Sequence, residues 1–260
     1  MNFETIKLAT EGRIALLTLN RPDKRNAISP QMIDDLFAAF DEIEAGPVCV
    51  VILTGAGKAF CAGMDLEALR ESANAPHGQQ LEDSRRTAYL FRRIWGFPKA
   101  TIAAVNGAAI AGGCGLATLC DFTLASPDAK FGYTEVNIGF VPAFVSVFLA
   151  RQIGEKNARE LLLSGRIFDA QEAHYLGLVT MVVAGDCLLD RAREIASVVA
   201  AASPSSIAQT KRLLIASAAE DVDRELASAI AASAAVRRTS DFKEGLAAFL
   251  EKRAPKWTGH

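Results

Sequence analysis

The sequence predicts an α/β fold with a mainly helical C-terminal region. Up to about residue 143, strand-like apolar runs alternate with helical patterns, an alternation typical of layered α/β folds. Beyond that point helical patterns dominate, with one strand-like run near residues 179–183. A chain of 260 residues is within reach of one such core with a helical appendage. We therefore divide it into a core over residues 1–195 and a helical region over residues 196–260.

Local signals place the elements of the core in order. Residues 3–8 and 14–19 are rich in strand formers and flank the turn signal Glu11-Gly12, which predicts a hairpin. Ser29-Pro30 predicts a capped helix N-terminus. Further strands are expected at residues 48–54, 101–105 and 122–125, and further helices at residues 65–71 and 82–95. Residues 72–80 predict a mobile loop because they are polar and contain proline and glycine.

Composition and charge exclude several functional classes. The net charge is -2, and Lys and Arg are scattered, so we expect no nucleic-acid partner. No uninterrupted apolar stretch reaches the length of a membrane span, and the N-terminus resembles neither a secretory signal nor a transit peptide. Five cysteines, an odd number without a C-x-x-C pair, indicate reduced thiols. We expect a cytoplasmic protein with no membrane partner.

Two glycine-rich junctions, residues 55–63 and 106–115, each follow a predicted strand. The first begins Gly55-x-Gly57, but Phe60 stands at the third glycine position of a dinucleotide-binding fingerprint. The glycines of both junctions could simply form tight turns. Alternatively, glycine allows close approach of backbone to a ligand, and free amides at helix starts could hold a thioester oxygen as an oxyanion hole. The residues alone leave these interpretations open.

Short motifs follow one another along nearly the whole chain. They are Asn20-Arg21-Pro22 with Arg25-Asn26-Ala27, Lys58-Ala59-Phe60-Cys61-Ala62-Gly63-x-Asp65-Leu66, Ala104-Val105-Asn106-Gly107 with Ala111-Gly112-Gly113-Cys114, Phe131-Gly132-x-x-Glu135-x-x-Ile138-Gly139, Ala170-x-Glu172-Ala173-x-x-x-Gly177-Leu178-Val179, and Glu244-Gly245-x-x-Ala248-Phe249-x-Glu251-Lys252-Arg253. In type and order they resemble the crotonase (enoyl-CoA hydratase/isomerase) family. The resemblance implies a spiral of β-β-α units, an acyl-CoA thioester substrate, and a homotrimer or homohexamer. No separate cofactor is implied, since coenzyme A enters as part of the substrate, and no metal site is predicted.

The same resemblance implies roles for individual residues. The backbone amides of Met64 and Gly112 would form the oxyanion hole, and Glu135 would be the catalytic acid/base. Taken alone, Glu135 could equally be a solvated carboxylate or a helix-start acid. Contacts to coenzyme A are implied for Arg25, Ala27, Lys58, Asp65 and Leu66, and for Phe249 and Lys252, the last two toward a neighbouring subunit. Residues 196–260 would thus serve oligomerisation and closure over coenzyme A.

Two departures from the family pattern affect the expected chemistry. Gly115 stands where hydratases of the family carry their first glutamate. Pro142-Ala143-Phe144-Val145-Ser146 replaces the glycine-rich Pro-Gly-x-Gly-Gly of many hydratases, which suggests a drier pocket that raises the pKa of Glu135. We expect a hydratase of 2-enoyl-CoA. The alternatives are a single-glutamate Δ3-Δ2-enoyl-CoA isomerase, a non-catalytic acyl-CoA binder, and a nicotinamide-dependent enzyme.

Other polar residues have simpler interpretations. Cys114 is expected to be a buried thiol rather than a nucleophile. Asp121 is expected to anchor a loop. His77 and His174 have no spaced partner that would indicate a metal site or a catalytic triad.

Overall fold

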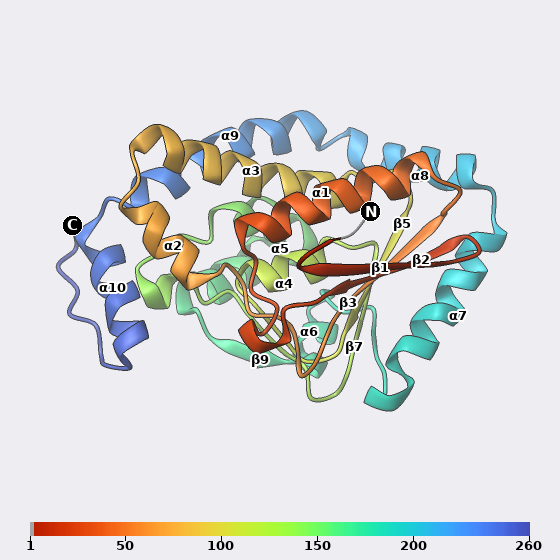
Figure 1. Ribbon diagram of the computed structural model, residues 1–260, viewed down its shortest axis with the longest axis horizontal. Coiled ribbons are helices and arrows are strands. Elements are labelled where there is room, and N and C mark those ends of the chain that lie inside the picture. The colour runs from red at the N-terminus through yellow and green to blue at the C-terminus, as the bar shows by residue number, and fades with distance from the viewer. Residues whose placement is uncertain (1–2) are drawn as a thin grey trace.

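In the computed structural model, which describes residues 3–260, a six-stranded sheet forms the centre of the fold (Figure 1). Its order is β1 (Ile6–Glu11), β2 (Ile14–Leu19), β3 (Val50–Gly55), β5 (Ala100–Val105), β7 (Phe122–Ala125) and β10 (Met181–Val182). The β1–β2 pair is antiparallel, which confirms the predicted hairpin, and every other neighbouring pair is parallel. The first strand begins at Ile6 rather than at residue 3 as predicted.

A second, four-stranded sheet consists of short strands that the sequence analysis did not predict. Its order is β4 (Ala59–Cys61), β6 (Ala108–Ile110), β8 (Lys130–Gly132) and β9 (Ile167–Asp169). The chain passes from β3 to β4, from β5 to β6 and from β7 to β8, each time followed by helical structure. Each passage therefore adds one strand to each sheet. The expected spiral of β-β-α units is confirmed.

Helices cover both faces of the large sheet (Figure 1). On one side α1 (Pro30–Ala45), α3 (His77–Trp95) and α9 (Ala219–Val236) run next to one another, and α7 (Leu188–Ala201) packs on the other. Strand β3 alternates between the two layers, because Val50 and Ile52 contact the α7 side while Val51 and Leu53 join the main core. The central strands β3 and β5 are buried along their whole length, as strands of parallel sheets usually are.

The remaining helices complete the chain. They are η1 (Pro22–Lys24), α2 (Leu66–Ala73), α4 (Gly112–Thr118), η2 (Glu135–Ile138), α5 (Ala143–Ser164, interrupted at Gly154), α6 (Ala170–Tyr175), η3 (Gly185–Cys187), α8 (Pro204–Ala216) and α10 (Ser240–Glu251). Ser29 caps α1 as predicted, since its side chain accepts a hydrogen bond from the amide of Met32.

The predicted boundary at residue 195 lies inside α7. Among residues 3–260 no helix combines the length and apolar character of a membrane span.

The predicted loop over residues 72–80 is wrong. Helix α2 continues to Ala73 and α3 already begins at His77, so only residues 74–76 connect them. Side-chain hydrogen bonds between the end of α2 and the first turns of α3 stabilise this tight connection. The Gln80 side-chain amide donates to the carbonyls of Ser72 and Ala73 at 3.1 and 3.2 Å, and the Ser72 hydroxyl donates to Asp83 at 2.7 Å.

The C-terminal helix α10 lies in backbone contact with the η2 turn. A Cβ added to Gly245 of α10 would be 2.5 Å from the Ile138 carbonyl oxygen. At Gly139, where φ is +67°, an added Cβ would be 2.5 Å from the Asp241 carbonyl oxygen. Glycine at both positions permits this approach. The turn that carries Glu135 is therefore held by the end of the chain.

Candidate active site

The two glycine-rich junctions converge in space. Strands β4 and β6, one from each junction, pair in parallel. Gly63 has φ +89°, and a Cβ there would lie 2.9 Å from the Ile110 carbonyl oxygen and 3.6 Å from the Gly112 nitrogen. A Cβ on Gly113 would lie 2.2 Å from the Cys61 carbonyl oxygen. Backbone therefore meets backbone, which glycine alone allows.

The amides of Met64 and Gly112 both border one cavity at this junction. On either side of Met64 the backbone is engaged with Ile28, whose amide donates to Gly63 at 2.8 Å and whose carbonyl accepts from Asp65 at 2.9 Å. Gly112 begins α4, and the first amides of a helix have no partner within it. Within residues 3–260 neither amide donates to another group of the chain. Two hydrogen-bond donors are thus available to a ligand.

Ala111 adopts a backbone conformation that presents the start of α4 to the cavity. Its φ is 51° and its ψ -124°, a left-handed combination that is costly for a residue with a Cβ. Its own amide donates to the Gly132 carbonyl at 2.7 Å, so β8 holds the strained residue in place. Such strain is characteristic of functional turns, and here it lies directly before Gly112.

The Glu135 carboxyl group borders the same cavity. It belongs to the first residue of η2, the residue is 9% exposed, and its Oε2 atom has no hydrogen-bond partner among residues 3–260. Burial raises the pKa of Glu135 to about 7, although its own backbone amide opposes the shift. Phe144 and Val145 are among the apolar residues of the lining. The expectation that a dry pocket raises this pKa is confirmed.

The position of the missing glutamate is filled with hydrocarbon. A Cβ on Gly115 would lie 2.4 Å from Cε1 of Phe91 on α3 and 2.7 Å from Cγ1 of Val145 on α5. A second carboxylate at this position would have to displace both side chains. The inner cavity, of about 150 Å³, is accordingly apolar over most of its surface.

An outer groove of about 590 Å³ adjoins the inner cavity and shares Met64, Leu66 and Phe249 with it. It brings together five of the seven residues expected to contact coenzyme A, namely Arg25, Ala27, Asp65, Leu66 and Phe249. The loop before α1 is tied into the groove by Asn26, whose side-chain amide donates to the carbonyls of Ala56 and Ala59 at 2.9 and 2.8 Å. The groove thus has a pre-formed wall.

Asp65 acts as a helix-start residue and as an ion-pair partner. Its side chain accepts from the amide of Glu67 at 3.1 Å and so caps α2. Its other oxygen lies 2.9 Å from Nη2 of Arg21. The Nη1 of the same arginine donates to the Ala27 carbonyl at 2.6 Å. Arg21 therefore positions two residues of the groove, a role that the sequence analysis did not assign to it.

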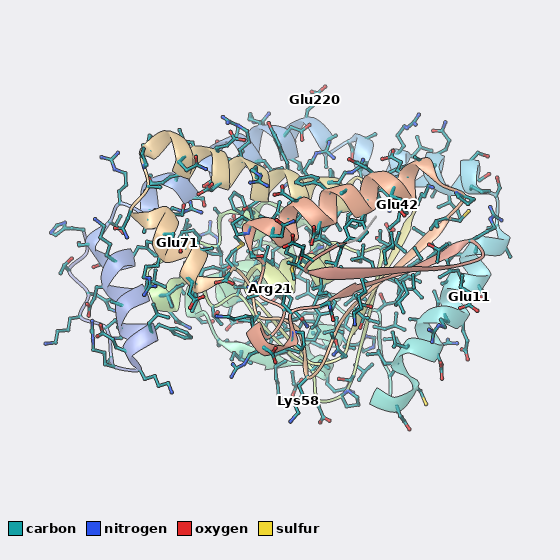
Figure 2. The ribbon with its side chains drawn as sticks, in the orientation of Figure 1. Glu11, Arg21, Glu42, Lys58, Glu71 and Glu220 are labelled. Atoms are coloured by element: carbon teal, nitrogen blue, oxygen red, sulfur yellow. The ribbon has the colours of Figure 1, made fainter. Side chains whose placement is uncertain are left out.

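Two residues expected to bind coenzyme A lie outside both cavities, and a third, Phe249, lies in the groove of its own chain. Lys58 is exposed, lines neither cavity, and lies at the lower edge of the molecule in Figure 2. Lys252 is the exposed cap of α10 and also lines neither. Phe249 borders both cavities of its own chain, whereas the resemblance implied contact with a neighbour's coenzyme A.

Other candidates have the simpler roles that the sequence indicated. Cys114 is buried, and burial raises the pKa of its thiol to about 12, which makes it a poor nucleophile. Asp121 anchors a loop by accepting from the amide of Thr101 at 2.8 Å and pairing with Lys211 at 2.5 Å. In the described part of the chain no three His, Cys, Asp or Glu side chains gather as metal ligands would.

Arg237 is a residue of the inner cavity that the sequence analysis missed. It lies at the C-terminal end of α9, where the sequence showed only the end of a helix. Only the packing of α9 on α3 brings it to the cavity.

The double-sheet spiral and the convergent amides are those of a crotonase-fold protein. The chain superposes on the crystal structure of an enoyl-CoA hydratase/isomerase from Xanthobacter autotrophicus Py2 with a TM-score of 0.89 and 35% identity, over 97% of this chain and 98% of that one. It belongs to the enoyl-CoA hydratase/isomerase family, whose model matches residues 9–260, and is an enzyme of that family.

Two relatives illustrate the similarity at the level of sequence. A Thermus thermophilus protein, assigned provisionally by its name to the enoyl-CoA hydratases, is 45% identical over 95% of this chain and 98% of its own length. A short-chain-enoyl-CoA hydratase of Clostridium acetobutylicum is 35% identical over 97% of both chains. The nicotinamide alternative loses its basis, because Gly55-x-Gly57 leads into β4 and not into the helix that a dinucleotide fingerprint requires.

Proposed function

We propose that the chain is an enoyl-CoA hydratase that adds water to 2-enoyl-CoA thioesters, with Glu135 as its acid/base. One observation carries the proposal. The buried Glu135 carboxyl, with one oxygen unpartnered, borders the same cavity as the available amides of Met64 and Gly112. Enolate chemistry next to a thioester needs a proton carrier at the α-carbon and donors at the carbonyl oxygen. The names of the relatives support hydration as the reaction.

The two cavities divide the substrate between them. The outer groove, with Arg25 and the capped start of α2, suits the polar coenzyme A part. The inner cavity, lined mainly by hydrocarbon, suits the acyl chain. The thioester then lies at their shared wall, where the amides of Met64 and Gly112 would hold its oxygen.

A single carboxylate can complete the hydration cycle. Ionised Glu135 takes a proton from water as the water oxygen bonds to C3 of the enoyl chain. The electron pair of the double bond moves onto the thioester oxygen, and the enolate is stabilised by the two amides, each worth about a hundred- to a thousand-fold in rate. Protonated Glu135 then gives its proton to C2, which restores the carboxylate and completes the addition of water.

Isomerisation is the second candidate, and the filled space beside Gly115 favours it. Phe91 and Val145 occupy the place from which a second glutamate would hold water. With a 3-enoyl-CoA, Glu135 would remove a proton from C2 and return it to C4, so the double bond moves into conjugation and no water is needed. Both reactions pass through a thioester enolate held by the same two donors, that of a 3-hydroxyacyl chain in hydration and a dienolate in isomerisation.

The test compares crotonyl-CoA with trans-3-hexenoyl-CoA, for the native protein and Glu135→Gln, with products separated by chromatography. Formation of 3-hydroxybutyryl-CoA that is lost in Glu135→Gln supports the hydratase. Conversion of only the 3-enoyl substrate, to 2-hexenoyl-CoA, supports the isomerase. Binding of both thioesters without turnover, unchanged in Glu135→Gln, would contradict both reactions and leave a non-catalytic acyl-CoA binder.

We further propose that the protein is a cytoplasmic homotrimer or homohexamer. Large apolar side chains are exposed on this single chain, as at subunit contacts: Leu163, Ile167, Tyr175, Val198, Leu213 and Leu214. The free cysteines, four of them buried, fit a reducing compartment. Sedimentation equilibrium tests the assembly, and a monomer at micromolar concentration would contradict it.

A further inference from the structure

A buried arginine borders the inner cavity, and in the described part of the chain it has no carboxylate partner. Arg237 is 2% exposed and lines both the inner cavity and a smaller cavity beside it. Its Nη1 donates to the Ser84 hydroxyl at 2.7 Å, to the Ser233 hydroxyl at 3.0 Å and to the Ser233 carbonyl. All three acceptors are uncharged. Its Nε has no hydrogen-bond partner.

The carboxylate that attracts Arg237, that of Asp83, already accepts hydrogen bonds from other side chains. Asp83 attracts Arg237, but its oxygens accept from the Ser72 hydroxyl at 2.7 Å and the Gln79 amide at 2.8 Å. Burial lowers the pKa of Arg237 to about 10, so the guanidinium still carries its charge at neutral pH. A buried charge without a counter-ion is costly to the fold and is usually paired or functional.

The guanidinium has the shape to receive an anion and N–H groups left to do so. Its planar fork of N–H donors matches a carboxylate in a bidentate arrangement. The ring of Phe140 lies 5.2 Å from its Cζ, a cation–π distance that restrains the plane of the group. Phe140 also lines the inner cavity, together with Leu69 and Thr87. Among residues 3–260, Arg237 is therefore the one basic side chain in the lining of this mainly apolar cavity, whose acidic side chain is Glu135.

We propose that the acyl chain of the substrate ends in a second carboxylate and that Arg237 binds it, so the substrate class is an ω-carboxyacyl-CoA. This inference rests on the proposed use of the inner cavity for the acyl chain. In such a complex the substrate supplies the counter-ion that the protein lacks. A chain ending in a methyl group would instead leave the guanidinium buried and unpaired, which disfavours its binding.

A purely structural arginine is the competing explanation. Arg237 joins α9 to α3 through Ser84, and this link alone could account for its burial. A structural link would affect the binding of every acyl chain equally. The two explanations therefore differ in how removal of the charge changes the preference between chain ends.

The experiment measures binding without turnover, by titration calorimetry of saturated thioesters. Succinyl-, glutaryl-, adipyl- and suberyl-CoA are each compared with the methyl-ended acyl-CoA of equal carbon number. The native protein is expected to prefer the carboxylate end by at least tenfold at one chain length or more. Arg237→Met should weaken that complex roughly 30- to 1000-fold while changing the methyl-ended complex less than threefold, and Arg237→Lys should lie between.

Several results would overturn the inference. They are the absence of a carboxylate preference at every length, a preference that survives in Arg237→Met, and equal affinity for 6-hydroxyhexanoyl-CoA and adipyl-CoA. If Arg237→Met does not fold, the series on the native protein and on Arg237→Lys still decides. Because no reaction is needed, a carboxylate preference without turnover would refute the proposed hydratase and keep this inference, and turnover without preference would do the reverse.

Discussion

Glu135→Gln is expected to stabilise the folded protein at alkaline pH and to leave its stability unchanged at acid pH. The pKa of Glu135 rises from 4.5 to about 7 on folding because the carboxyl is buried. Each pKa unit corresponds to about 1.4 kcal/mol, so ionisation costs the folded state about 3 kcal/mol more than the unfolded chain. Glutamine has nearly the shape of the protonated acid and does not titrate.

The pH window follows from the direction of this shift. A folded pKa above the unfolded value means that the contribution of Glu135 to stability is fully present below pH 4.5. That contribution is lost as the pH rises through about 7. The difference between Glu135→Gln and the native protein should therefore be close to zero at pH 4.5 and reach about 3 kcal/mol above pH 7.5.

Urea unfolding at acid and alkaline pH measures this difference, with protein concentration held constant because the proposed assembly would contribute to stability. In thermal melts the alkaline difference corresponds to roughly 6–12 °C for a chain of this size. Glu220→Gln is the matched control, since Glu220 is exposed on α9 (Figure 2). A stability difference that is equal at both pH values, or a Glu135→Gln variant that is less stable at alkaline pH, would refute the reasoning.

Three further predictions follow from the same cavity. First, kcat/KM should rise with pH with an apparent pKa near 7, because only the carboxylate form of Glu135 accepts a proton; a profile controlled by a group near 4.5 would contradict this. Second, Gly115→Glu should lower stability by about 1–3 kcal/mol without faster hydration of crotonyl-CoA, because its Cβ would lie 2.4 Å from Phe91; a gain in rate would show that the space exists. Third, Ala111→Gly should stabilise the protein by about 1 kcal/mol by relieving a positive φ of 51°, measured by urea unfolding, and a loss of stability would argue against strain there.

The parts of the fold that the sequence predicts are those with complete local patterns. The β1–β2 hairpin has a turn signal between two strand-forming runs, and α1 has its cap and proline in adjacent positions. The three-residue strands of the second sheet carry no periodicity. Their pairing depends on approaches between distant backbone segments, such as Gly113 against Cys61. A pattern read along the chain cannot contain such a contact.

The prediction of a loop at residues 72–80 was wrong because it, too, depended on contacts that a local pattern does not contain. Pro76 is a poor residue for a helix interior but a suitable neighbour of a helix start, and α3 begins directly after it. The choice between loop and helix depends on the hydrogen bonds of Gln80 and Asp83 back to the end of α2. These bonds form only once the two helices are packed.

In the site, too, residues that belong to local motifs were predicted, and a residue placed by a contact between distant segments was not. The resemblance predicted Glu135, Met64 and Gly112, and the structure brings all three to one cavity, because each belongs to a motif with a fixed local shape. Arg237 belongs to no such motif. Its place beside the cavity results from a contact between residues 84 and 237, which lie on different helices.

The sequence departs from the family pattern at Gly115 and at residues 142–146. The side chains packed beside Gly115 connect these two departures. Phe91 and Val145 fill the space of a second carboxylate, and Val145 also belongs to the apolar lining that Glu135 borders. The hydrocarbon at the position of one acid therefore belongs to the same apolar surroundings in which burial raises the pKa of the other to about 7. At such a pKa both forms of Glu135 are well populated at neutral pH, so one residue can take a proton and return it within a cycle. Under the proposed function, hydration would require room for a water molecule next to C3, and Phe91 and Val145, which fill the space beside Gly115, are the side chains to vary in testing this.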